Sequence, residues 1–156
     1  MKVILSWYEI FMGAEVGLAR MIASMKMSGT NKVNNKDFGW HSDIEGALAE
    51  VAVAKHLNIF WDGSVNTFKR PDVGSLQIRH TQHKNGCLIV RRGDSDDEIY
   101  VLVTGTHPED ELRGFMHGFE AKVDEFWRNV DGKVTSPAWF VPQSRLTKME
   151  LLGWGR

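Results

Sequence analysis

The chain has 156 residues and a mass of 17.7 kDa, so we expect a single domain, residues 1–156, with one hydrophobic core. Its 19 basic and 20 acidic residues give a net charge of −1, so overall charge indicates neither a nucleic acid nor a membrane as its partner. The one cysteine, Cys87, excludes an internal disulfide, and no apolar run approaches the roughly 20 residues that cross a bilayer, which together favour a cytoplasmic location.

The first predicted element is a long amphipathic helix. Apolar residues recur at helical spacing from Trp7 onwards, and Ser6 with Glu9 three residues later forms a capping box directly before them. We expect this helix to end near Gly29, before a polar loop over residues 30–36.

The second predicted helix carries the first candidate functional residue. Ser42 and Glu45 form another capping box, and small residues over 44–57 suit a helix that packs closely against a sheet. Glu50 lies on a largely apolar stripe of this helix, where a carboxylate is costly without a partner. This cost favours a functional role, and the alternative is an edge carboxylate that reaches solvent or pairs with an arginine.

From residue 65 the hydrophobic period changes and predicts a meander of strands. We expect these strands at about residues 65–69, 76–82, 87–92, 99–104 and 111–116. Asn85-Gly86 predicts a two-residue hairpin turn, and the apolar run at 100–103 is typical of a central strand. A helix over about 119–128 and a short strand over 138–141 complete the predicted α/β fold.

Basic residues cluster locally although the whole chain is nearly neutral. Between residues 66 and 92 the only acidic residue is Asp72. A local positive field of this kind can guide a phosphate backbone, although solvated strand faces often have the same composition. The candidate nucleic-acid contacts are Lys69, Arg70 and Lys84.

The segment from Pro71 to Arg79 is the strongest candidate site. Alternate residues of a strand share a face, so Gln77 and Arg79 present an acceptor and a cation side by side. Asp72 can join them only if the chain bends at Gly74, because five residues of straight strand span roughly 16 Å. Such a group could hold a hard metal ion beside a phosphate. The alternative is an ordinary turn in which Asp72 bonds its own backbone.

These residues resemble a known family of nucleases. A helical Glu50, then Pro71-Asp72, then Gln77-Ile78-Arg79 resembles the PD-(D/E)xK superfamily, whose last element is usually Asp or Glu, any residue, then Lys. The resemblance covers about residues 41–141 and is closest to small phage-type members. It implies a phage-encoded protein that acts in the host cytoplasm.

The resemblance also implies a fold. We expect a restriction-endonuclease-like αβββαβ core over residues 41–143, with a mixed β-sheet flanked by helices. The N-terminal helix, residues 1–29, would be an addition to this core.

The resemblance further implies a Mg²⁺ or Mn²⁺ site held by Glu50, Asp72, Gln77 and the Ile78 carbonyl group. Gln77 would replace the second strand carboxylate, and Arg79 would stand where the lysine belongs. Arginine cannot act as a general base, but it can neutralise charge that develops on a phosphate. Two carboxylates where a fuller site supplies three predict weak metal binding.

The sequence thus predicts a metal-dependent DNA endonuclease with Glu50, Asp72, Gln77 and Arg79 as its catalytic residues. A homodimer would suit cleavage of both strands of a duplex. The alternative is a degenerate nuclease fold that binds nucleic acid without cutting it, or that serves as a phage accessory or assembly protein.

Two further patterns are weaker. His80 and His83 lie three residues apart, but no third metal ligand is evident, so both are expected at the surface. Glu120 and Lys122 imitate the strand motif, but residues two apart on a helix point about 200° apart. We expect them in a solvated first turn.

Overall fold

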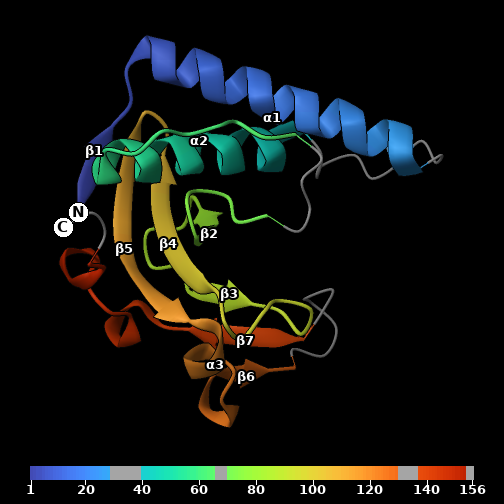
Figure 1. Cartoon of the computed structure of the whole chain (residues 1–156). Helices are drawn as coiled ribbons and strands as arrows, with labels where there is room; N and C mark the ends of the chain where they lie inside the picture. Colours follow the sequence, from blue (N-terminus) through green and yellow to red (C-terminus); the bar gives the residue numbers. More distant parts are fainter. Residues whose placement is uncertain (29–39, 66–69, 130–136, 154–156) are drawn as a thin grey trace.

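A computed structural model of the chain describes residues 1–28, 40–65, 70–129 and 137–153. Two long helices, α1 (Trp7–Ser28) and α2 (Trp40–Leu57), lie against each other. Figure 1 shows α1 outermost and α2 between α1 and a curved β-sheet. The strand predicted at 65–69 falls almost wholly outside the described residues.

Within these ranges the larger sheet has four strands in the order β1-β5-β4-β2. They are β1 (Lys2–Ile4), β5 (Glu109–His117), β4 (Ile99–Thr106) and β2 (Leu76–Thr81). β5 is antiparallel to both of its neighbours, whereas β2 and β4 are parallel. The prediction of an α/β fold with a mixed sheet is therefore confirmed, while the specific restriction-endonuclease-like core stays a prediction.

A smaller antiparallel sheet lies near the ends of β4 and β5 that are farther from α1 and α2 (Figure 1). Its strands, in spatial order, are β3 (Leu88–Val90), β7 (Ala138–Val141) and β6 (Trp127–Arg128). Short helical segments connect or follow these strands: α3 (Gly118–Ala121) and the 3₁₀ turns Asp124–Phe126, Gln143–Arg145 and Met149–Leu151.

The predicted meander is confirmed for the antiparallel neighbours β4 and β5 but is wrong for β2 and β3, and the hairpin at Asn85-Gly86 is also wrong. After β2 the chain turns, with Gly86 N–H donating to the His83 carbonyl oxygen at 2.8 Å, and β3 then joins the other sheet. Because β3 does not pair with β4, β2 occupies this edge of β4 and pairs with it in parallel. β4 is buried between two strands, as the apolar run at 100–103 predicts.

The helix predicted at 119–128 is also wrong. α3 ends at Ala121, and the chain continues into a 3₁₀ turn and then β6. Trp127 pairs with Trp139 across β6 and β7, with ring centroids 4.7 Å apart. The apolar spacing that suggests a helix therefore belongs to a buried turn residue, Phe126, followed by a short strand.

Two groups of buried side chains cover the two faces of the larger sheet. Val101 and Val103 of β4 pack in the same cluster as the apolar residues of α2, while Tyr100 and Leu102 pack toward the smaller sheet. On β2, Leu76 and Ile78 belong to the α2 side. The intervening residues of β2 therefore face away from α2.

The helix starts agree only in part with the prediction. Ser6 and Glu9 do form a capping box, because Ser6 N–H donates to Glu9 Oε2 at 2.6 Å and Glu9 N–H donates to Ser6 Oγ at 3.4 Å. α2 begins at Trp40, before the predicted cap, so Glu45 lies inside the helix and its side chain contacts Gln82 instead. Among the described residues, no helix is both long and apolar enough to cross a membrane.

The close approach of α1 and α2 gives a direct test of their packing. A Cβ atom on Gly17 would lie 2.5 Å from Ile44 Cα and 2.8 Å from the Asp43 carbonyl oxygen, whereas one on Gly46 would meet nothing within 4 Å. We expect Gly17→Ala to lower the free energy of unfolding by about 1–3 kcal/mol. Gly46→Ala should raise it by about 0.5–1 kcal/mol, because alanine is the better helix former.

Urea denaturation of both variants measures this difference. If Gly17→Ala is as stable as Gly46→Ala, the two helices do not pack at Gly17.

Candidate active site

Glu50 is a buried carboxylate held by groups outside its own helix. It is 4% exposed, and Arg20 of α1 donates to its two oxygens at 2.5 and 2.8 Å. Trp61 Nε1 also donates to Oε2, at 2.9 Å, while Arg20 Nε donates to the Ser64 carbonyl oxygen. Glu50 thus pairs with an arginine, which is the alternative to the functional role expected from the sequence. The pair connects α1 to α2 and to the segment that follows α2.

Asp72 lies at the free edge of β2, the outermost strand of the larger sheet as described. The Ile78 N–H donates to Asp72 Oδ2 at 2.7 Å. The chain turns back between them, since Asp72 N–H and Val73 N–H both donate to the Leu76 carbonyl oxygen, and Gly74 has a φ of 61°. The bend expected at Gly74 is therefore present, and it brings Asp72 against β2.

Burial is the main influence on the ionisation of Asp72. The pKa of Asp72 is raised to about 6, mainly by burial and to a smaller extent by the nearby charge of Glu50. The Ile78 hydrogen bond and the charges of Arg79 and Arg20 lower this pKa, but they do not restore its ordinary value. Asp72 therefore lies within electrostatic reach of both Glu50 and Arg79.

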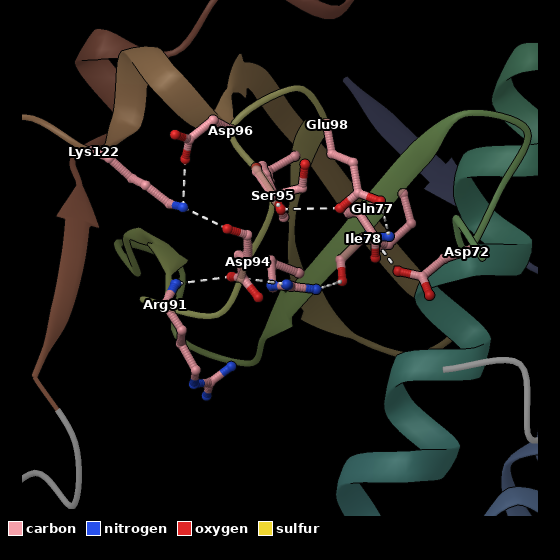
Figure 2. Close-up of polar contacts among 11 residues, drawn as sticks. Asp72, Gln77, Ile78, Arg91, Asp94, Ser95, Asp96, Glu98 and Lys122 are labelled. Atoms are coloured by element: carbon pink, nitrogen blue, oxygen red, sulfur yellow. Dashed lines mark hydrogen bonds and ion pairs between the residues drawn. The ribbon is translucent and has the colours of Figure 1, made fainter. Parts of the chain in front are cut away.

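Gln77 lies beside a carboxylate that sequence reasoning missed. Gln77 Nε2 donates to Glu98 Oε1 at 3.1 Å (Figure 2). The Tyr100 hydroxyl donates to Glu98 Oε2 at 3.1 Å. Glu98 directly precedes β4, and the parallel pairing of β4 with β2 brings it close to Gln77. A parallel pairing in place of the expected meander would have predicted this contact.

Arg79 is held in one position by three contacts. Its guanidinium group donates to Asp94 Oδ2 at 3.1 Å and to the Ile78 carbonyl oxygen at 3.3 Å, and it lies over the Tyr100 ring, 5.1 Å from the centroid. Arg79 Nε is buried and has no hydrogen-bond partner in the described part of the chain. The side chain is thus a fixed positive charge next to Ile78.

The loop from Asp94 to Glu98 is fastened by a lysine from another element. Figure 2 shows Lys122 reaching this loop, where Nζ donates to the Asp94 carbonyl oxygen and, at 2.5 Å, to Asp96 Oδ1. The Lys122 side chain is only 15% exposed, so the expectation of a solvated turn is wrong for this residue. The helix ends before Lys122, which lets the side chain turn toward the loop.

The candidate nucleic-acid contacts lie outside this site. Arg70 is exposed and pairs with Asp62 at 3.5 Å, and Lys84 is exposed at the turn that follows β2. Lys69 lies outside the described residues. The expectation that His80 lies at the surface is wrong, because its side chain is 5% exposed under α2, whereas His83 is exposed as expected.

Comparison with known proteins adds no family assignment, because no family model, curated protein or solved structure matches the chain. The candidate site therefore rests on its residues and their geometry. That geometry brings Asp72 and Arg79 to the backbone of Ile78, whereas the neighbouring Gln77 contacts Glu98. Glu50 pairs with Arg20 and Trp61 and influences Asp72 through its charge alone.

Replacing Asp72 with asparagine should stabilise the protein in a pH-dependent way. Because folding raises its pKa from 3.8 to about 6, the ionised carboxylate opposes folding increasingly as the pH rises through this range, and the penalty is small near its lower limit. Asparagine keeps an acceptor for the Ile78 N–H without the charge. We expect Asp72→Asn to raise the free energy of unfolding by about 1–3 kcal/mol at about pH 8, and by much less at about pH 4.

Urea denaturation in the presence of a chelator measures both values. Asp124→Asn is the matched control, since Asp124 is exposed on a 3₁₀ turn, and it should show no such pH dependence. An equal effect of Asp72→Asn at the two pH values would contradict the raised pKa.

Proposed function

We propose that the chain is a Mg²⁺- or Mn²⁺-dependent DNA endonuclease of the PD-(D/E)xK type, which hydrolyses phosphodiester bonds at the free edge of β2. The observation that carries the proposal is the hydrogen bond between Ile78 and the Asp72 carboxylate at that edge. Gln77 and Arg79 flank this contact on the same strand, and the charge of Glu50 reaches Asp72.

The residues at this edge suit a hard divalent ion, which prefers oxygen ligands. The N–H and carbonyl groups of one strand residue point to the same side, so the Ile78 carbonyl oxygen faces the free edge together with its N–H. Asp72 supplies a carboxylate, and Gln77 can offer its amide oxygen because its nitrogen is bonded to Glu98. A cation here would also offset the cost of burying the Asp72 carboxylate, which is the main reason for its raised pKa.

While Glu50 is paired with Arg20, it contributes negative charge to the site but offers no free oxygen to a metal ion. Both of its oxygens accept hydrogen bonds from Arg20, and Trp61 donates to one of them. Direct coordination by Glu50 would require one of these bonds to be given up. Its charge still favours a cation beside Asp72.

Arg79 is suited to neutralise charge on the phosphate. Its contacts with Asp94, Ile78 and the Tyr100 ring fix the guanidinium group before substrate binds, and preorganised charge of this kind stabilises transition states. Arg79 stays protonated, so it cannot take a proton from water. A bound divalent ion would supply that step by lowering the pKa of the attacking water.

One observation supports a second function, which is nucleic-acid binding without cleavage. The Arg20–Glu50 pair already neutralises one carboxylate of the site, and both Gln77 and Arg79 depart from the residues usual in active nucleases. A site of this composition would hold phosphate more readily than it would hold a metal ion.

A cleavage assay separates the two functions. Supercoiled, linear, single-stranded and branched DNA incubated with the protein and Mn²⁺ should give shorter or nicked products, and a chelator should abolish them. Asp72→Asn should lower the rate by about 100-fold or more, because the ion loses a ligand. The exposed Asp124→Asn should cut like the wild type.

Wild-type protein that retains DNA in a salt-dependent way but yields no product would support binding without cleavage. Products that persist in Asp72→Asn at the wild-type rate would contradict the assignment of the site to this edge.

A further inference from the structure

Two histidines and an aspartate meet at the other end of β2, on the face toward α2. His80 comes from β2, His107 from the turn between β4 and β5, and Asp110 from β5. One nitrogen of each histidine and one carboxylate oxygen all lie within 4.8 Å of one another. β2 and the β4–β5 hairpin thus meet in one polar cluster.

This cluster contains buried polar atoms that no described residue satisfies. Asp110 is fully buried, and its Oδ2 lies 2.9 Å from His107 Nδ1. Asp110 Oδ1 and His107 Nε2 are also buried, and neither has a hydrogen-bond partner within the described ranges. Leaving such atoms unpaired costs about 1–3 kcal/mol each, so the cluster calls for a ligand that binds both kinds of atom.

His80 is the third member of the cluster, and the Glu45 carboxylate lies next to its ring. Its ring stacks on that of His107, with centroids 5.0 Å apart, and its Nδ1 lies 3.6 Å from Glu45 Oε2 of α2. Its Nε2 lies 3.2 Å from the Gly105 carbonyl oxygen. Metal-binding histidines usually have such an outer carboxylate or carbonyl partner, which orients the ring.

We propose that His80, His107 and Asp110 bind a divalent transition-metal ion of the zinc class. Two imidazole nitrogens and one carboxylate oxygen match the ligands that Zn²⁺ and Co²⁺ accept, whereas Mg²⁺ prefers oxygen alone. Metal–ligand distances of about 2.0–2.2 Å place tetrahedral ligand atoms about 3.4 Å apart, so atoms that now lie within 4.8 Å need to approach by at most about 1.4 Å. The ion would join β2 to the β4–β5 turn.

This site is independent of the proposed nuclease site. His80 shares the α2-facing side of β2 with Ile78, whereas Gln77 and Arg79 point to the other face. The two sites also differ in the ions that they prefer. Loss of one site therefore leaves the other testable.

Co²⁺ titration followed by visible absorption tests the proposal. Wild-type protein should bind one equivalent of Co²⁺ with a d–d spectrum typical of mixed nitrogen and oxygen ligands, which Zn²⁺ displaces and excess Mg²⁺ does not. His107→Gln and His80→Gln should each weaken binding by more than about 100-fold, because even outer partners of a metal site are worth about 10–100-fold.

Two matched controls locate the ion. His83→Gln removes an exposed histidine three residues beyond His80, and Asp72→Asn removes the central carboxylate of the nuclease site. Both should bind Co²⁺ as the wild type does. If either weakens binding as much as His107→Gln does, the proposal is overturned.

NMR of the histidine ring nitrogens in the wild-type protein removes any dependence on the folding of the variants. Stoichiometric Zn²⁺ should shift the signals of His80 and His107 and leave that of His83 in place. Wild-type protein that binds no Co²⁺, or Zn²⁺ that shifts only exposed histidines, would overturn the proposal.

Discussion

Among the described residues β2 is an edge strand of the larger sheet, and its free edge is the constraint on which the candidate site depends. An edge strand leaves backbone N–H and carbonyl groups without partners from a neighbouring strand. Here the Asp72 carboxylate accepts from the Ile78 N–H, and the Arg79 guanidinium donates to the Ile78 carbonyl oxygen. The turn at Gly74 makes this contact accessible to Asp72. The two backbone groups of Ile78 thereby bring an anionic and a cationic side chain to one point of the sheet.

The Arg20–Glu50 pair, in which Glu50 is buried and Arg20 is partly exposed, acts on this edge through its charges. Removing one partner of a buried ion pair typically costs about 3–5 kcal/mol, because the other charge is left uncompensated. The pair joins α1 to α2, and the same Glu50 charge raises the pKa of Asp72. A stabilising interaction between two helices therefore also influences the ionisation of Asp72, with Glu50 raising its pKa and Arg20 lowering it.

Local patterns predict the elements better than they predict their partners. The capping box of Ser6 with Glu9, most of α2 and the bend at Gly74 follow from neighbouring residues, and all three are present. The parallel pairing of β2 with β4 depends on contacts between distant segments, which no local pattern reveals. Glu98 and Lys122 were missed for this reason, as was the burial of His80.

Anomalous diffraction from crystals soaked in Mn²⁺ tests whether this edge binds a metal ion. We expect a manganese peak at the free edge of β2, about 2.0–2.6 Å from oxygen atoms of Asp72 and Ile78. That peak should be absent from crystals of Asp72→Asn. Wild-type crystals whose only manganese peaks lie away from Asp72 would contradict a metal site at this edge.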